Sequence, residues 1–353
     1  MSKSSGPKRN KASVVDLFCG AGGLSHGFKL EGFQLAAGID MDEVCRFPYE
    51  TNNGVPFIRK DVSTLKADYI ERLFTPGLVR ILVGCAPCQP FSVYNQKNDD
   101  PKWRLLHSFG RIIDRVRPDI VSMENVPRLL KFKGGRTFKS FTNKLSKAGY
   151  DVTWGVLYGP DFGMAQTRSR LVLLASRLGE IALPEPTHKG AYLTVQDKIG
   201  NLPPLRHGES DPSDPFHCSS RLSETNVLRI TAAKPGGTWR DWDPELVTAC
   251  HKEESGRGYS SVYGRMKWTE PSPTITTQFY GFGNGRFGHP EQDRALSLRE
   301  GAILQGFPRE YEFVRAGERI HYKTVGRMIG NAVPVTLARA IAKAVQSHIR
   351  SIG

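Results

Sequence analysis

Short apolar runs alternate with amphipathic segments in the first half of the chain. The runs are rich in aliphatic and β-branched residues, have the length of buried strands, and cover residues 12–18, 34–40, 79–84, 118–126, 153–159 and 170–176. Helix-like segments such as 104–117 and 137–148 lie between some of them. Because strands that alternate with helices form parallel sheets, this pattern predicts an α/β fold with a mostly parallel sheet.

The composition and periodicity of the chain change near residue 184. Residues 184–290 are rich in Pro, Gly, Ser, His, Arg and Tyr and show little helical or strand periodicity, whereas helical patterns return over 294–307 and 335–349. We therefore expect an α/β domain interrupted by a smaller irregular one. The expected division is a basic disordered tail over 1–12, the α/β domain over 13–184, the irregular domain over 185–290, and a return to the first domain over 291–353.

Charge and cysteine usage narrow the class of protein. The 353 residues carry 49 Lys and Arg against 35 Asp and Glu, a net charge of +14, which favours binding to a polyanion but also fits a basic protein without such a partner. Six cysteines spread along the chain do not form a disulfide scaffold, so a reducing compartment is expected. No secretory signal and no run of roughly 20 apolar residues is evident, so we expect a cytoplasmic protein outside the membrane.

The segment "DLFCGAGG" (16–23) places a glycine-rich turn between a strand and a helix. Such a turn suits a nucleotide-type ligand that meets main-chain N–H groups, although an ordinary strand-to-helix turn has the same composition. Asp40 closes the next strand, where a carboxylate reaches ribose hydroxyls, and Asp61 could accept from an adenine amino group. Because no phosphate cradle or Walker lysine is present, an adenosine ligand without phosphates fits better.

The segment "GCAPCQPFS" (84–92) contains a CxxC pair, which is compatible with a metal clip, a redox couple or a single nucleophile. Zinc normally takes four ligands and no second pair follows, so no metal site is expected. Pro87 and Pro90 argue against the helix start of a redox pair. The remaining interpretation is a nucleophile, Cys88. A free thiol with a pKa of ~8.5 is only about 3% thiolate at pH 7, so the site must either raise that fraction or take up the proton during attack.

Three other segments carry side chains that such a nucleophile needs. "MENV" (123–126) puts Glu124 at a strand end, "QTRSR" (166–170) puts Arg168 and Arg170 on one side of an extended chain, and "IGNAVP" (329–334) offers Asn331. Taken singly, these segments also fit an ordinary strand end, a solvated basic face or a turn.

In order, "DLFCGAGG", "PCQPFS", "ENV", "QTRSR", "RALSLREGAILQGFP" and "GNAVP" closely resemble the motifs of the DNA (cytosine-5)-methyltransferases, of the bacterial or phage type. The resemblance covers 14–176 and 291–349 and leaves a variable region where that family keeps its target-recognition domain. It implies a Rossmann-like methyltransferase domain with a mostly parallel sheet, plus a smaller irregular target-recognition domain.

The resemblance implies S-adenosylmethionine as cofactor and S-adenosylhomocysteine as product. Asp40 is expected to take the ribose, Met41 to pack on the adenine, and Asp61 to meet its amino group. The full expected pocket is Phe18, Gly20, Gly23, Asp40, Met41, Asp61, Val62, Pro87, Leu105, Asn331 and Val333.

The same resemblance assigns the chemistry. Cys88 adds to ring carbon 6 of cytosine, which turns carbon 5 into a nucleophile towards the sulfonium methyl. Glu124, in a protonated form that burial favours, donates to ring nitrogen 3. Arg170, with Arg168 acting through packing or main-chain contacts, holds the cytosine carbonyl oxygen. The base that removes the carbon-5 proton is not identified, and Cys85 is expected to be a small buried neighbour.

Recognition of DNA requires further residues, because the target cytosine must leave the base stack. Ser92, Val93 and Tyr94 are expected to fill the vacated space or touch the minor-groove side. Two Gly-, Tyr- and Arg-containing stretches, 256–266 and 277–286, resemble recognition loops. The candidate contacts there are Arg257, Tyr263, Arg265 and Tyr280, each of which could instead stabilise a loop.

Several alternatives stay open at this point. An RNA (tRNA) cytosine-5 methyltransferase is the nearest, and a catalytically silent DNA-binding homologue is another. The expected partner is double-stranded DNA. We expect a cytoplasmic monomer of prokaryotic or phage origin, associated with the nucleoid through DNA, with a cognate restriction endonuclease or other defence genes in the same system.

Overall fold

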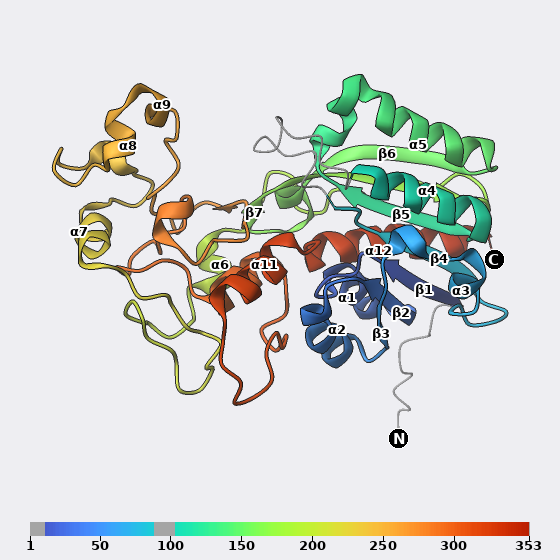
Figure 1. Cartoon of the computed structure of the whole chain (residues 1–353), viewed down its shortest axis with the longest axis horizontal. Coiled ribbons are helices and arrows are strands. Elements are labelled where there is room, and N and C mark those ends of the chain that lie inside the picture. Colours follow the sequence, from blue (N-terminus) through green and yellow to red (C-terminus); the bar gives the residue numbers. More distant parts are fainter. Residues whose placement is uncertain (1–10, 88–102, 353) are drawn as a thin grey trace. The chain divides into compact units, whose positions relative to one another are not determined.

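The computed structural model describes residues 11–87 and 103–352 (Figure 1). Its contacts divide the chain into two units. The sheet unit comprises the chain up to Tyr158, Ser169–Thr187 and the chain from Ala332; the irregular unit comprises Gly159–Arg168 and His188–Asn331. The sequence pattern predicts a return to the first domain at residue 291, whereas these contacts group 159–168 and 291–331 with the irregular unit.

The sheet unit is built on seven strands in the order β3-β2-β1-β4-β5-β8-β6. The strands from β3 to β5 are parallel, and β8 is antiparallel to both β5 and β6. This arrangement confirms the predicted α/β fold with a mostly parallel sheet. The strands are β1 (Ala12–Leu17), β2 (Gln34–Asp40), β3 (Phe57–Arg59), β4 (Val79–Gly84), β5 (Ile120–Asn125), β6 (Asp151–Tyr158) and β8 (Ser169–Ser176).

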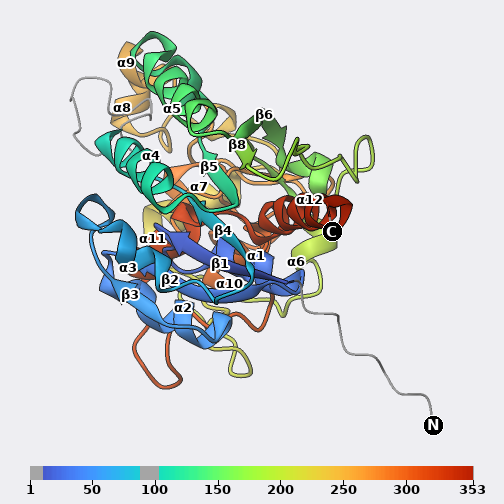
Figure 2. The ribbon, with the colours of Figure 1, turned by 90° about the vertical axis from the view of Figure 1, so that its right-hand side faces the viewer.

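Helices cover both faces of this sheet (Figure 2). On one face, α4 (Arg104–Val116) and α5 (Arg136–Lys147) pack on alternate strand residues in a large apolar core. On the other, α1 (Gly23–Leu30) packs on α12 (Val335–Ile352) so closely that a Cβ added at Gly27 would lie 2.3 Å from the Ala338 side chain. The shorter helices are α2 (Arg46–Asn53) and α3 (Ala67–Glu71), with 3-10 turns η1 (Glu43–Cys45), η2 (Val62–Thr64) and η6 (Pro127–Gly135).

The C-terminal helical stretch Tyr322–Ile352 has the length and apolar content of a membrane span, a possibility that the sequence pattern did not indicate. However, 61% of its most apolar window is buried inside the protein. That burial is typical of a core helix, so the stretch is weak evidence for a membrane segment.

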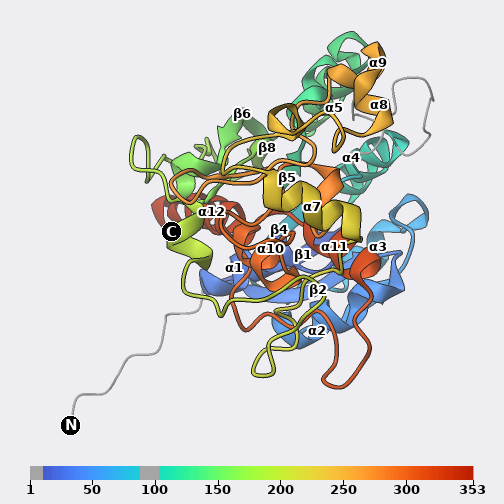
Figure 3. The same cartoon turned by 90° about the vertical axis from the view of Figure 1, so that its left-hand side faces the viewer.

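The irregular unit contains short helices joined by long segments without regular structure (Figure 3). Two tryptophans, Trp239 and Trp242, pack with Ile230, Phe282 and neighbouring apolar side chains in its core. The helices are α6 (Val195–Ile199), α7 (Glu224–Ala232), α8 (Ala249–Lys252), α9 (Glu254–Arg257), α10 (Leu298–Leu304) and α11 (Tyr322–Asn331). The remaining elements are strands β7 (Gln166–Thr167) and β9 (Ser272–Pro273) and the turns η7 (Gly159–Phe162), η8 (Trp239–Asp241) and η9 (Phe282–Asn284).

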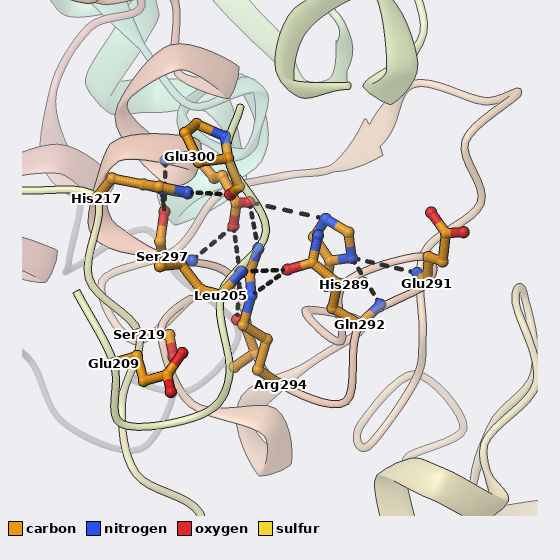
Figure 4. Close-up of polar contacts among 12 residues, drawn as sticks. Leu205, Glu209, His217, Ser219, His289, Glu291, Gln292, Arg294, Ser297 and Glu300 are labelled. Atoms are coloured by element: carbon orange, nitrogen blue, oxygen red, sulfur yellow. Dashed lines mark hydrogen bonds and ion pairs between the residues drawn. The ribbon is translucent and has the colours of Figure 1, made fainter. Parts of the chain in front are cut away.

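A buried polar network supports this unit at the start of α10 (Figure 4). Arg294 donates from both terminal nitrogens to the Glu300 carboxylate at 2.7 Å, and both side chains are almost fully buried. Ser297 and Glu300 form a reciprocal capping box, and the Ser297 hydroxyl also contacts His217 Nδ1 at 2.8 Å. Burial alone would raise the pKa of Glu300, but the adjacent Arg294 guanidinium lowers it to about 2.

His289 belongs to the same network in a neutral form. Its Nδ1 accepts from the main-chain N–H groups of Glu291 at 3.2 Å and Gln292 at 2.9 Å, an arrangement that requires an unprotonated nitrogen. Burial lowers the pKa of His289 from 6.5 to about 4, although Glu300 works in the opposite direction.

Acidification is therefore expected to destabilise the fold through His289. The folded pKa is lower than the unfolded value, so the unfolded chain takes up a proton first as the pH falls from about 6.5 towards 4. The free energy of unfolding should drop by on the order of 3 kcal/mol over that window because of this group. Chemical denaturation at several pH values, compared with His289→Gln, measures the contribution; equal slopes for both proteins would contradict it.

Candidate active site

The register of β1 against β4 brings the glycine-rich turn and the Cys85 segment together. Strand order reverses between β1 and β4, which is where open α/β sheets bind ligands beyond the carboxyl ends of their strands. Leu17 at the end of β1 lies opposite Gly84 at the end of β4. A Cβ added at Gly84 would lie 3.0 Å from the Leu17 carbonyl oxygen, so the strands approach closely here. The glycine-rich turn and the Cys85 segment therefore start side by side.

Backbone conformation explains the glycine-rich turn. Phe18, Gly20 and Gly22 all have positive φ angles, of 60°, 50° and 94°. The Gly20 N–H donates to Asp40 Oδ2 at 2.9 Å, which ties the turn to the end of β2. Gly23 begins α1, and a Cβ there would lie 2.3 Å from the Val333 carbonyl oxygen. Four of the predicted cofactor residues, Phe18, Gly20, Gly23 and Asp40, thus share one small region with Val333.

Asp16 is a functional candidate that the sequence reasoning missed. It is buried in β1, its Oδ2 accepts from the Ser25 hydroxyl at 2.7 Å, and its Oδ1 has no hydrogen-bond partner among the described residues. Burial raises the pKa of Asp16 to about 7, and the negative charge of Asp40 adds to this effect. Burial also raises the pKa of Asp40. An acidic residue inside an apolar strand, directly before a glycine-rich turn, was the available signal.

These two carboxyl groups fit S-adenosylmethionine, which is a cation at its sulfonium and α-ammonium groups. A cationic ligand would relieve the repulsion between Asp16 and Asp40 and could use the uncompensated Asp16 oxygen. Among the described residues, no cluster of three or more His, Cys, Asp or Glu side chains has the arrangement of a metal site.

The other predicted cofactor residues lie in varied surroundings. Met41 is 63% exposed. Asp61 is also exposed, and its carboxylate caps η2 by accepting from the Ser63 N–H at 2.8 Å. Val62 is buried, whereas Pro87 and Leu105 are half-buried. Asn331 ends α11 in the irregular unit and is exposed.

Glu124 and Arg170 meet on neighbouring strands. In the antiparallel pairing of β5 with β8, Glu124 lies opposite Val172, so Arg170 is its diagonal neighbour on the same face. Arg170 Nε lies 2.9 Å from Glu124 Oε1 in a nearly buried ion pair. The Cys85 thiol donates to Glu124 Oε2 at 2.9 Å. Cys85 therefore does more than the predicted small neighbour, because it engages the carboxylate directly.

Asn125 is a second residue that the sequence reasoning missed. Its side-chain amide donates to the Ala86 carbonyl oxygen at 3.0 Å and accepts from the Val126 N–H. This contact holds the start of the CxxC segment against the end of β5. Cys88, Ser92, Val93 and Tyr94 lie outside the described residues.

Nearly the whole chain resembles known proteins. Residues 12–347 match the family model described as C-5 cytosine-specific DNA methylase. The chain belongs to this family. It is 50% identical over 342 residues to Type II methylase M.HgiDII of Herpetosiphon aurantiacus, with 96% of each chain covered. It is 34% identical to Type II methyltransferase M1.HphI of Haemophilus parahaemolyticus, covering 94% of this chain and 86% of that one.

A solved structure supports the fold independently. A putative DNA modification methyltransferase encoded within a prophage of E. coli superposes with a TM-score of 0.75 at 22% identity, covering 95% of this chain and 99% of that one. The predicted family, fold, enzyme class and cofactor are therefore confirmed. The protein is a DNA (cytosine-5)-methyltransferase that takes its methyl group from S-adenosylmethionine.

In this cytosine-5 methyltransferase Arg168 is buried and bound to main-chain groups. It lies between β7 and β8, and its guanidinium donates to the carbonyl oxygens of Ile275 at 3.1 Å and Gly330 at 3.4 Å. These contacts are all within the irregular unit. Arg168 therefore fastens three segments of that unit together.

Arg265, one of the predicted base-reading residues, is buried. Its side chain is 4% exposed, and its guanidinium donates to the carbonyl oxygens of Ile230, His289 and Gln292 and to the Asp293 carboxylate. These contacts engage both terminal nitrogens, whereas the buried Nε has no hydrogen-bond partner among the described residues. Sequence could not reveal this, because exposed and buried arginines look alike in a Gly-rich segment.

The other three recognition candidates differ in accessibility. Tyr263 has a φ of 55° and packs edge-on against Trp242 and Phe282, with ring centroids 5.5 Å away in both cases. Tyr280 packs on Tyr322 of α11 at 5.5 Å. Arg257 is exposed at the end of α9, where it donates a long 3.4 Å bond to the Lys252 carbonyl oxygen.

Proposed function

We propose that the chain methylates carbon 5 of a flipped-out cytosine in one short duplex sequence, through a covalent adduct between Cys88 and ring carbon 6. The observation that carries this assignment of residues is the Glu124–Arg170–Cys85 cluster, which lies beside the glycine-rich turn at the carboxyl edge of the sheet. S-adenosylmethionine, when bound, supplies the electrophilic methyl group.

The side chains at the carboxyl edge of the sheet have separate roles in this reaction. Cys88, as its thiolate, forms the bond to carbon 6. The resulting negative charge on the ring is met at nitrogen 3 by a proton that Glu124 must first take up, because a carboxylate paired with Arg170 has none to donate. Arg170 orients the Glu124 carboxyl through its 2.9 Å contact and offsets charge on the cytosine carbonyl oxygen. Asp16 and Asp40 hold the cationic cofactor, and departure of Cys88 after loss of the carbon-5 proton frees the product.

We assign target recognition to residues 188–290 of the irregular unit, with Arg257 as the accessible arginine among the predicted contacts. Ser92, Val93 and Tyr94 remain predictions for the space that the flipped base vacates. Because M.HgiDII and M1.HphI are named Type II enzymes, we infer that this protein protects DNA in a restriction–modification system, with a cognate endonuclease. We further infer a cytoplasmic monomer that meets the nucleoid through its DNA substrate.

Bisulphite sequencing of DNA from cells without cytosine methylation of their own tests the function. Cells that express the chain should contain 5-methylcytosine in one fixed short context, close to complete at each site, and cells with an empty vector should contain none. Unmodified DNA from cells that hold folded protein would reject DNA methylation and direct the same assay to RNA.

A further inference from the structure

The positive charge of the chain is concentrated in one segment of the sheet unit. Residues 103–150 contain eleven Lys and Arg but only three Asp and Glu, so these 48 residues hold a net +8 of the total +14. The segment comprises α4, β5, η6 and α5. Glu124 is buried in the active site, which leaves Asp114 and Asp119 as the acids near the helical surface. The proposed chemistry at the sheet edge does not account for this excess.

The fold turns the basic side chains of α5 outward. Its buried positions are Thr137, Phe138, Phe141 and Leu145, and Phe141 stacks on Phe109 of α4 at 6.0 Å. The opposite face, at helical spacing of three to four residues, consists of Arg136, Lys139, Ser140, Asn143, Lys144 and Lys147. The apolar core thus fixes which way the basic stripe points.

These side chains line an open groove of about 630 Å³ together with Asp114 and Ala148. Asp114 is the one acidic residue in this lining, and it reaches Lys144 at only 3.7 Å with both side chains more than 40% exposed. The α4 and α5 helices start at the carboxyl edge of the sheet and run back across its face. The groove follows α5 from Arg136 to Ala148, so it extends away from the edge that holds Glu124 and Arg170.

Helix stability does not explain this stripe. Like charges three or four residues apart weaken a helix, and no acidic residue stands in the first turn of α5, where Arg136 and Lys139 oppose the helix dipole. Lys144 and Lys147 do suit the last turn. A bound polyanion would relieve the repulsion along the whole stripe, since each neutralised phosphate also releases counterions.

We propose that the basic face of α5 binds the phosphate backbone of a second segment of duplex DNA, outside the segment that holds the target cytosine. The 12-residue helix is about 18 Å long, which matches roughly five base pairs of duplex at 3.4 Å each. Ser140 and Asn143 add uncharged donors of the kind that contact phosphate. The contact is independent of sequence, so it retains the enzyme on long DNA between target sites. The inference rests on the proposed function only in taking DNA as the polyanion.

A triple variant, Lys139→Gln with Lys144→Gln and Lys147→Gln, tests the surface. Binding of the full-length variant to a duplex of about 60 base pairs without a target site should weaken about tenfold near physiological salt, with a log–log salt slope smaller by roughly two to three. Fluorescence anisotropy across a salt series measures both quantities. On a duplex of about 15 base pairs that contains only the unmethylated target site, kcat should equal that of the wild type.

The matched control removes the same charge elsewhere on the sheet unit: Lys66→Gln with Lys343→Gln and Arg350→Gln, all exposed and outside the groove. It should bind the long duplex within about twofold of wild type. Equal weakening by both variants would assign the effect to net charge and overturn the proposal, as would an unchanged α5 variant. If wild type methylates nothing, the proposed function fails, while the binding comparison still decides this inference. Circular dichroism checks that each variant is folded.

Discussion

Replacing Cys88 with alanine is expected to abolish methyl transfer while leaving DNA binding largely intact. Without addition to carbon 6, carbon 5 of cytosine is too weak a nucleophile for the sulfonium methyl, so turnover should fall at least about a thousandfold. Transfer of radiolabelled methyl groups to DNA measures the loss, and a gel-shift assay measures binding.

Cys250→Ala is the matched control for this experiment, because Cys250 is a free, exposed cysteine of the irregular unit. It should methylate at the wild-type rate. Retained turnover by Cys88→Ala would remove Cys88 from the nucleophile role, and loss of DNA binding by that variant would point to a misfolded protein rather than to missing chemistry.

Replacing Arg294 with methionine should have the largest effect on stability. The substitution leaves the Glu300 carboxylate buried without its two-point partner, which typically costs about 3–5 kcal/mol of unfolding free energy. The combination Arg294→Met with Glu300→Gln removes both charges and keeps an acceptor for the Ser297 N–H. It should therefore be more stable than Arg294→Met alone, as measured by chemical denaturation.

An exposed ion pair of the same unit provides the contrast. Lys267 contacts Glu270 at 2.7 Å, with side chains 44% and 54% exposed, so Lys267→Met should cost less than about 1 kcal/mol. Similar losses from Lys267→Met and Arg294→Met would show that burial does not control the strength of the Arg294–Glu300 pair.

Local pattern was sufficient to predict the sheet and its chemistry. Alternating strand and helix signals predicted the α/β fold, because the period of apolar positions can be recognised from residues close together in the sequence. The ordered segments from "DLFCGAGG" to "GNAVP" predicted the family and the cofactor, both of which the comparisons confirm. The three-residue strand β3 escaped prediction because so short a run has no readable period.

Only the tertiary structure decided which side chains contact one another and which are exposed to solvent or ligands. The register of β1 against β4 places the two distinctive loops together, and the register of β5 against β8 pairs Glu124 with Arg170. The contact of Cys85 with Glu124 joins residues 39 positions apart. Pairings of this kind depend on how strands associate, which short-range sequence patterns do not record.

Burial decided the remaining cases. Arg265 and Arg257 lie in the same Gly-rich stretch. The Arg265 guanidinium is buried and donates to main-chain carbonyl groups, whereas Arg257 is exposed. Asp16 and His289 acquire their unusual proton affinities from the same cause, because removal from water penalises the charged form. Residue type and order thus determined the reaction, whereas long-range packing determined which of these groups water, cofactor or DNA can reach.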